Sequence, residues 1–194
     1  MDYDFEQMRL EILSKNSKNV MKDIPKIPSL RNACILAKHS LASPSHGTAV
    51  ENWLIEYYNC KRIPSSDKEG DLRFHDQYNV EVKSSISKDG KKFNYVQLRP
   101  THQIDFYLMP SYDMLNDNLF IFFVHQSEMK KMILQYGSYA HGTKEEKGLI
   151  SENIDNQDVE FAIRPKIQKG KQWSELIHYQ VELDDLKQKN KFEL

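Results

Sequence analysis

The pattern of hydrophobic and polar positions predicts helices in the first third of the chain. Apolar residues recur at helical spacing from Phe5 to Lys22 and again from Ser29 to Ala42. A polar break with proline and glycine follows, in which Ser45 or Thr48 can cap a third helix from about Ala49 to Cys60. The chain therefore opens with three helical segments before any strand pattern begins.

Strand patterns begin at Leu72. The stretch from Leu119 to Val124 is the most hydrophobic in the chain, which predicts a central strand with both faces covered. Helical spacing returns in residues 128–136 and 173–179. Strands and helices therefore occur together along one chain, which predicts an α/β (α+β) fold class. The remaining predicted strands are Leu72–Phe74, Tyr78–Lys83, Phe93–Leu98, Phe106–Met109 and Val159–Arg164.

Composition favours a folded, single-domain protein. The chain has 194 residues, of which 39% are hydrophobic and 28% charged, and this balance suits a globular domain better than a disordered chain. We expect one domain over residues 1–194, with an N-terminal helical part (1–44), a core (45–136) and a C-terminal part (137–194). No apolar run is long enough to span a bilayer, and the acidic start does not resemble a signal peptide. Cys34 and Cys60 lack metal-binding spacing, which favours a reducing cytoplasm.

The net charge of −1 narrows the range of partners. Proteins that coat nucleic acid are usually basic overall, so this charge counts against such a role. It is compatible with an enzyme that encloses DNA in a local basic cleft, because acidic site residues lower the total charge. The histidines show no metal-ligand spacing, and the sequence contains no Cys/His zinc pattern and no glycine-rich phosphate loop.

The predicted hairpin formed by the first two strands carries the strongest candidate chemistry. Alternation in its second strand places Glu81 and Lys83 on the face opposite Val80 and Val82. Asp71 stands at the start of the first strand and can converge with Glu81 across the hairpin. Two carboxylates suit Mg²⁺, which takes oxygen ligands, and the lysine can hold a water molecule beside the ion. The pattern therefore predicts metal-assisted hydrolysis of a phosphodiester.

Asp71 followed by Glu81, Val82 and Lys83 resembles the signature of the PD-(D/E)xK nuclease superfamily, which includes most type II restriction endonucleases. Gly70 stands where the family usually has proline. The resemblance implies a restriction-endonuclease-like core, in which a central mixed β-sheet is flanked by helices. It implies Asp71 and Glu81 as catalytic metal ligands, the Val82 carbonyl as a further ligand, and Lys83 as the residue that orients the attacking water. Mg²⁺ would be the cofactor, and Mn²⁺ would substitute.

The same resemblance implies an acidic residue on the helix before the hairpin. Glu51 matches that position in order and context, as a catalytic residue that binds a metal directly or through water. Its alternative role is that of a first-turn glutamate that favours the helix N-terminus. Asp67, in the polar loop before the hairpin, is an alternative ligand that ranks below Asp71.

Three further segments are candidates for DNA contact. The resemblance places one of them after the lysine-bearing strand. Another is the glycine-bounded polar loop from Gly137 to Gly148, since site-specific nucleases place base contacts in such loops. The last is a basic cluster after the final strand, suited to phosphates; the loop and the cluster have the alternative of being plain solvated connections. The candidate DNA-binding residues are Gln97, Arg99, His102 and Gln103, then Tyr139, His141, Thr143 and Lys144, then Lys166, Lys169 and Lys171.

The resemblance implies a Mg²⁺-dependent, site-specific endonuclease that cuts double-stranded DNA in the bacterial cytosol and leaves 5′-phosphates. Cutting two strands needs two active sites, so we expect a homodimer on a palindrome, or a strand-cutting subunit that works with a larger DNA-recognition subunit. Two other interpretations stay open. One is a repair or recombination nuclease without sequence specificity, and the other is a non-catalytic DNA-binding protein with a decayed nuclease fold.

Overall fold

The structure, a computed structural model, describes residues 17–64, 66, 68–140 and 160–192. The chain divides into two compact units, residues 1–61 and residues 62–194. This division coincides with neither boundary expected from the sequence, after residue 44 and after residue 136, and the single-domain organisation stays a prediction. Within the described ranges, no helix is both long enough and apolar enough to cross a bilayer.

The first unit is helical, and its local sequence explains where the helices begin. Ser29 caps the second of the predicted helices, because its hydroxyl accepts a hydrogen bond from the Asn32 N–H at 3.3 Å. The buried indole N–H of Trp53 donates to the Ile27 carbonyl at 2.8 Å. Residues 5–16 of the first predicted helix lie outside the described residues. The elements are α2 (Ser17–Asp23), η1 (Ile24–Lys26), α3 (Leu30–Ser40) and α4 (Ser45–Tyr58).

The start of α4 differs from the prediction. The helix begins at Ser45, so Ser45 and Thr48 lie inside it and neither caps it. Pro44 takes the N-cap position with a φ of −62°, which suits a helix start because the proline ring already fixes that angle. At the other end, Asn59 has a φ of +49°, and this left-handed conformation terminates the helix.

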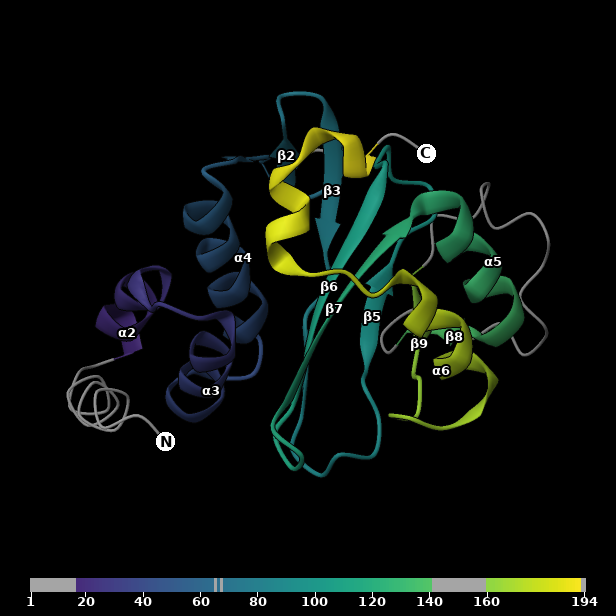
Figure 1. The fold of residues 1–194 in the computed structure, drawn as a ribbon, viewed down its shortest axis with the longest axis horizontal. Helices are drawn as coiled ribbons and strands as arrows, with labels where there is room; N and C mark the ends of the chain where they lie inside the picture. Colours follow the sequence, from purple (N-terminus) through teal and green to yellow (C-terminus); the bar gives the residue numbers. More distant parts are fainter. Residues whose placement is uncertain (1–16, 65, 67, 141–159, 193–194) are drawn as a thin grey trace. The chain divides into compact units, whose positions relative to one another are not determined.

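The second unit is built on a mixed sheet of six strands (Figure 1). β2 and β3 form the predicted antiparallel hairpin, with Leu72 opposite Val80 and Phe74 opposite Tyr78. β3 pairs parallel with β6, and β6 pairs antiparallel with β7 along its whole length. The strands are β1 (Lys61–Arg62), β2 (Leu72–Phe74), β3 (Tyr78–Val82), β4 (Ser85–Ser87), β6 (Phe106–Asp113) and β7 (Asn118–His125).

β3 and β4 lie along the same edge of β6 and pair with it in one continuous register. The break between β3 and β4 is caused by a proline in β6, which has no N–H to donate. The Lys83 N–H donates to the Leu108 carbonyl at 2.9 Å, but the next bond of the parallel ladder would need an N–H at Pro110. The ladder therefore breaks directly after Lys83. β4 was not among the strands predicted from the sequence.

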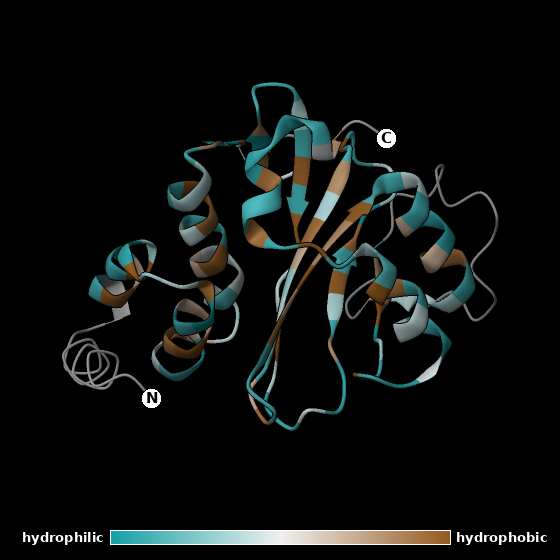
Figure 2. Ribbon diagram, in the orientation of Figure 1, coloured by the Kyte–Doolittle hydropathy of each residue, from teal (hydrophilic) through white to brown (hydrophobic). Residues whose placement is uncertain are grey.

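β7 is hydrophobic, but it is not a central strand as predicted. Among the described strands it pairs only with β6, apart from an isolated bridge between Phe122 and Gln180. Both of its faces are nevertheless covered, since Phe122 and Val124 join the main core while Ile121 and Phe123 are buried on the other side. Figure 2 shows β6 and β7 as largely hydrophobic strands. The prediction held for burial and was wrong for the position in the sheet.

A three-stranded sheet and two helices pack on one face of β6 and β7 (Figure 1). β5 contains a bulge between Tyr95 and Leu98, where Gln97 takes a φ of +57°. The bulge lets Tyr95 and Leu98 both enter the core and leaves Gln97 exposed. The elements are β5 (Tyr95–Leu98), β8 (Ser138–Tyr139), β9 (Phe161–Ile163), α5 (Gln126–Tyr136), α6 (Gly170–Leu176) and η3 (Ile177–Tyr179).

The C-terminal segment packs on the opposite face through η4 (Leu183–Lys187) and η5 (Lys189–Phe192). Phe192 is buried, stacks on Tyr78 with ring centroids 4.8 Å apart, and contacts the ring of Phe106. The C-terminal segment is therefore packed against the sheet as far as Phe192. The second unit as a whole is a mixed α/β structure, with a mixed sheet flanked by helices.

Candidate functional site

Asp71 is anchored where β2 separates from β3. The Val82 N–H points toward β2 but lies beyond the first residue of that strand, and Asp71 Oδ2 accepts its hydrogen bond at 2.8 Å. The N–H and C=O groups of one strand residue point to the same side, so the Val82 carbonyl lies on the Asp71 side of β3. The structure thus brings two of the predicted ligand groups together.

Glu81 is a buried, charged side chain with a charged partner. It is 5% exposed, and its Oε1 lies 2.5 Å from Nζ of Lys83, whose side chain is also largely buried. On the neighbouring strand β6, the buried Tyr107 lies opposite Glu81. Burying a charged group away from water costs roughly several kcal/mol for each ion, unless nearby partners compensate for the lost hydration. Lys83 provides part of that compensation as the ion-pair partner of Glu81.

His102 approaches Glu81 from the loop after β5. Its Nδ1 lies 3.8 Å from Glu81 Oε2, which is too long for a hydrogen bond. The loop is held in place because the His102 N–H donates to the Arg99 carbonyl at 3.1 Å, and Gln126 Nε2 donates to the His102 carbonyl at 2.6 Å. The sequence suggested His102 only as a DNA contact. Its proximity to Glu81 had no local sequence signal, since the two residues come from separate elements.

The surroundings of Glu81 keep its carboxyl group charged. Burial raises the pKa of Glu81, but the side chains of His102 and Lys83 beside it lower the pKa by more, so it lies below its ordinary value. Burial also raises the pKa of Tyr107, and the negative charge of Glu81 adds to that shift. Glu81 is therefore available as an anionic ligand at neutral pH.

The side chains around Glu81 suit a divalent cation that takes its remaining ligands from water or substrate. Glu81 and His102 face each other, and Asp71 is anchored on the next residue of the strand. In the part of the chain that the structure describes, no group of three or more His, Cys, Asp and Glu side chains is arranged so that it could hold a metal ion by itself. Mg²⁺ often binds one or two carboxylates and takes its other oxygens from water and substrate phosphates. The carboxylates of Asp71 and Glu81 fit that mode of binding.

The structure describes the other acidic candidates only in part. Glu51 is half-buried in α4, within the first unit, and its Oε1 would lie 3.9 Å from a Cβ added at Gly47. The side chain therefore turns toward the first turn of its own helix. Its role in metal binding stays a prediction. Asp67 lies outside the described residues.

The candidate DNA contacts after β5 have different surroundings. Gln97 and Gln103 are exposed. Arg99 is engaged with the Glu160 carboxylate through both Nε, at 3.0 Å, and Nη2. A phosphate would have to compete with Glu160 for the Arg99 guanidinium group, which the sequence did not indicate.

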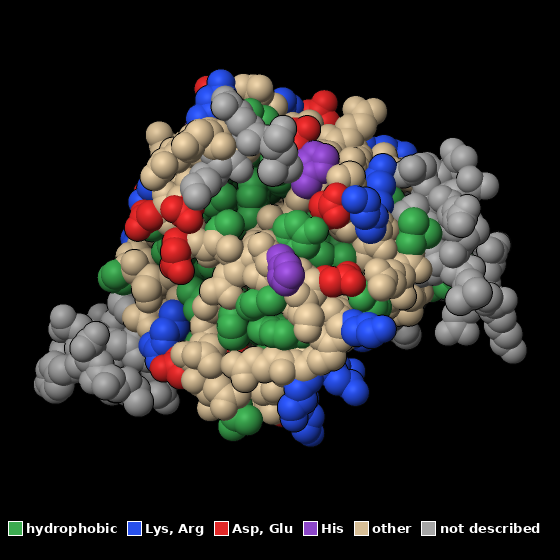
Figure 3. All heavy atoms as spheres, turned by 45° about the vertical axis from the view of Figure 1, so that its right-hand side comes forward, with side chains coloured by type: hydrophobic (Ala, Val, Ile, Leu, Met, Phe, Trp, Pro, Cys, Tyr) green, Lys and Arg blue, Asp and Glu red, His purple; other side chains and the backbone are tan. Residues whose placement is uncertain are grey.

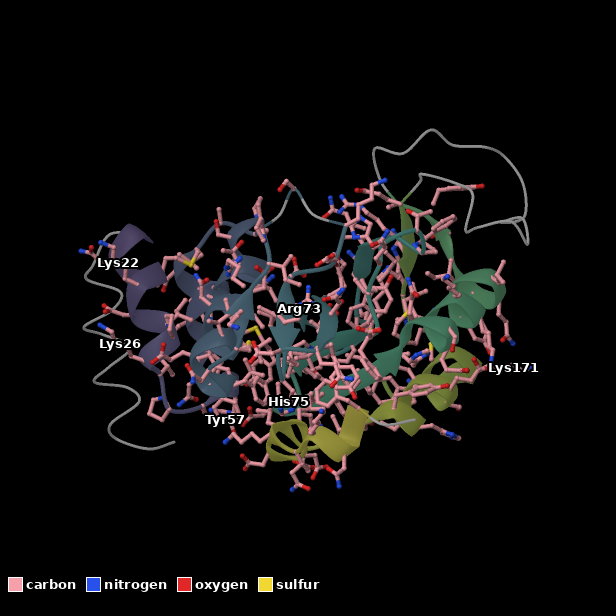
Figure 4. The ribbon with its side chains drawn as sticks, turned by 90° about the horizontal axis from the view of Figure 1, so that it is seen from above. Lys22, Lys26, Tyr57, Arg73, His75 and Lys171 are labelled. Carbon is pink, nitrogen blue, oxygen red and sulfur yellow. The ribbon has the colours of Figure 1, made fainter. Side chains whose placement is uncertain are left out.

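The glycine-bounded loop is described only at its start. Tyr139 in β8 stacks on Phe161 with ring centroids 5.4 Å apart. In the basic cluster after the final strand, Lys171 lies on α6, at the opposite edge of this unit from Arg73 of β2 (Figure 4). The candidate contacts His141, Thr143 and Lys144 lie outside the described residues.

Lys166 and Lys169 form part of a larger lysine cluster than the sequence showed. An isolated bridge joins Lys166 to Lys92, and Lys91 lies next to it in the chain. These four lysines line one open hollow of about 660 Å³. We call Lys91, Lys92, Lys166 and Lys169 the lysine hollow. Two segments that are far apart in the sequence thus present their positive charges together.

A second hollow, also of about 660 Å³, is lined by aromatic and histidine side chains. Figure 3 shows hydrophobic and histidine side chains gathered on one face, with acidic side chains beside them. Phe106 points to the face of β6 opposite Tyr107, so this hollow is separate from the Glu81 site. The lining includes Phe106, Phe123, His125, Glu128, His178 and Tyr179.

No protein-family model matches the chain, and no curated protein matches it either. The function must accordingly be inferred from the side chains around Glu81 and from the sheet that positions them.

Proposed function

We propose that the protein is a Mg²⁺-dependent, site-specific endonuclease that cuts double-stranded DNA, with a restriction-endonuclease-like core similar to that of type II restriction enzymes. The observation that supports it best is the buried pair of Glu81 and Lys83, with Asp71 anchored beside it on the same hairpin. A buried ion pair contributes little net stability, so a perturbed carboxylate in this position favours a functional role.

Asp71 and Glu81 would hold Mg²⁺, with the Val82 carbonyl as a further ligand. Bound there, the ion would polarise a phosphate oxygen and offset the charge that develops on the phosphate. The Lys83 ammonium group would orient the attacking water and stabilise negative charge on the scissile phosphate. Water attacks phosphorus in line, the bond to the 3′-oxygen breaks, and the products are a 5′-phosphate and a 3′-hydroxyl.

The proposal extends to assembly and location. The hairpin supplies one site for each chain, so cutting both strands calls for a homodimer around a two-fold axis. The runner-up is a strand-cutting subunit with a larger DNA-recognition partner. Cys34 is a buried free thiol, which fits the reducing cytosol in which such an enzyme would work.

The test compares Asp71→Asn and Lys83→Met with the parental protein on plasmid DNA in Mg²⁺ and in Mn²⁺. Asparagine keeps an oxygen acceptor for the Val82 N–H but loses the charge, and methionine keeps the length of lysine without the ammonium group. We expect each variant to cut at least about 100-fold more slowly, as when an enzyme loses one preorganised polar group.

Asp184→Asn and Lys187→Met serve as matched controls, because this pair is exposed and lies 2.7 Å apart in the C-terminal segment. The controls should cut at the parental rate. Cleavage at the parental rate by Asp71→Asn or by Lys83→Met would contradict the proposed mechanism. A digest of long DNA separates the alternatives, because discrete bands indicate a site-specific enzyme and a smear a non-specific repair nuclease. DNA binding without any cleavage would indicate a decayed fold.

A further inference from the structure

We propose that His102 supplies a nitrogen ligand to the cation held by Glu81, and that the site consequently prefers Mn²⁺ to Mg²⁺. This inference rests on the proposed function in taking Glu81 as a metal ligand. It adds a ligand that the Asp71, Glu81 and Lys83 signature does not contain.

The two oxygens of Glu81 have different neighbours. Oε1 is occupied by Lys83 Nζ at 2.5 Å. Oε2 faces His102 Nδ1 at 3.8 Å, within the range at which one cation can contact an oxygen and a nitrogen ligand together, each about 2.0–2.2 Å away. The distance is too long for a direct hydrogen bond. A shared cation would satisfy both atoms.

His102 Nδ1 is an unusual atom for a protein interior. It is buried and has no hydrogen-bond partner within the described ranges, and the same holds for Oγ1 of its neighbour Thr101. Most buried polar atoms in folded proteins are hydrogen-bonded, and each exception calls for an explanation. Two such atoms in one loop, one of them facing a buried carboxylate, indicate that this loop lines a ligand site.

The backbone of the loop that carries His102 is held in place by hydrogen bonds from neighbouring elements. Gln126, the first residue of α5, donates from Nε2 to the carbonyls of Pro100 and His102, at 3.2 and 2.6 Å. The Tyr107 hydroxyl contacts the Arg99 carbonyl at the start of the same loop. These bonds hold the loop backbone, so His102 is kept beside Glu81 without a bound cation.

A nitrogen ligand changes which cation the site prefers. Mg²⁺ takes oxygen ligands almost exclusively, whereas imidazole suits first-row transition metals, and affinity for a mixed nitrogen and oxygen site rises from Mn²⁺ along that series. Mn²⁺ also retains the octahedral oxygen chemistry that phosphate hydrolysis needs. Glu81 and His102 together therefore favour Mn²⁺.

The test measures metal binding without DNA. Calorimetry with Mn²⁺ and with Mg²⁺ compares the parental protein, His102→Ala and the control His178→Ala, whose side chain is exposed in the separate aromatic hollow. We expect His102→Ala to weaken Mn²⁺ binding about tenfold or more, or about 1.4 kcal/mol, and to change Mg²⁺ binding far less. His178→Ala should bind both ions as the parental protein does.

Electron spin-echo spectroscopy of bound Mn²⁺ gives a second, independent measurement. The parental protein made with ¹⁵N-histidine should show modulation from a directly bonded histidine nitrogen, and His102→Ala should lose it. Absence of this signal in the parental protein would overturn the proposal, even if the variant fails to fold. Equal Mn²⁺ affinity in a folded His102→Ala would overturn it as well.

The two proposals fail in different ways. A histidine nitrogen on Mn²⁺ in a protein that does not cut DNA would support the ligand assignment and contradict the endonuclease. Metal-dependent cleavage by a protein whose Mn²⁺ carries no histidine nitrogen would support the endonuclease and overturn the role of His102.

Discussion

At Gly70 the backbone takes a conformation that few other residues adopt. Its φ is +88°, and a Cβ added there would lie 3.0 Å from both the carbonyl carbon and the oxygen of Val80. Proline is fixed near a φ of about −65°, so it does not fit this position. The glycine lets the chain approach β3 closely and deliver the Asp71 carboxylate to the Val82 N–H. The residue that departs from the nuclease signature therefore has a steric reason.

We predict that Gly70→Ala destabilises the protein more than Gly170→Ala. Gly170 has a similar φ of +80° but no heavy atom within 4 Å of an added Cβ, so it isolates the cost of the backbone angle. Gly70→Ala should lower the unfolding free energy by more than about 1 kcal/mol, because it combines that cost with the contact against Val80. Urea unfolding of the two variants measures the difference, and equal losses would contradict it.

At the scale of elements, the hairpin positions the site through its alternation and through its pairing with β6. Val80 and Val82 are buried on one face, and the Glu81 and Lys83 pair lies on the other, against Tyr107. Both faces of β3 are therefore covered. A charged residue in such a strand needs charged or polar groups close to it, because water cannot reach it. This explains why Glu81 is surrounded by cationic or polar side chains.

The stability of the folded protein should depend on the Glu81 charge. The folded pKa of Glu81 lies below its ordinary value of 4.5, so its ionised form stabilises the protein above that pH, and this contribution is lost as the pH falls through the folded pKa. We predict that the parental protein is more stable than Glu81→Gln at about pH 6, and that the gap narrows on acidification. Urea unfolding across the acid range measures it, and a constant gap would refute the linkage.

The hairpin could be predicted because its signals are local. Strict alternation and β-branched residues place Glu81 beside Lys83 without any knowledge of the fold. His102 could not be placed beside Glu81 in this way, since their contact depends on a loop after β5 and on its bonds to Gln126. β4 was missed for a related reason, because its pairing depends on β6 and its short polar sequence resembles a turn.

At the scale of the whole molecule, the near-neutral net charge conceals local charge. The lysine hollow gathers Lys91, Lys92, Lys166 and Lys169 from two distant segments, with Asp89 as the acidic residue in its lining. Lys91 already pairs with Asp89 at 3.3 Å, which leaves Lys92 and Lys166 as the better candidates for phosphate contacts. A cluster of positive charges of this kind can bind a DNA backbone even when the net charge of the whole chain is close to zero.

The lysine hollow can be tested through the salt dependence of DNA binding. We expect Lys92→Ala and Lys166→Ala each to reduce the slope of log K against log salt by about 0.9, the value for one lost phosphate contact. Binding without a cleaving metal, followed by fluorescence anisotropy, gives the slopes. Lys187→Ala, an exposed lysine of the C-terminal segment, should keep the parental slope. Unchanged slopes in both hollow variants would exclude this surface from DNA contact.

We propose that the buried Glu81 carboxylate holds, with Asp71, the cation that allows the protein to cut DNA, while Lys83 orients the attacking water. The most direct measurement is the rate of plasmid cleavage by Glu81→Gln and by the parental protein at saturating Mn²⁺. Glutamine keeps the size and the hydrogen-bonding oxygen of the side chain but removes its charge. We predict cleavage at least about 100-fold slower than the parental rate, in a variant that remains folded. Cleavage by folded Glu81→Gln at the parental rate would contradict the account.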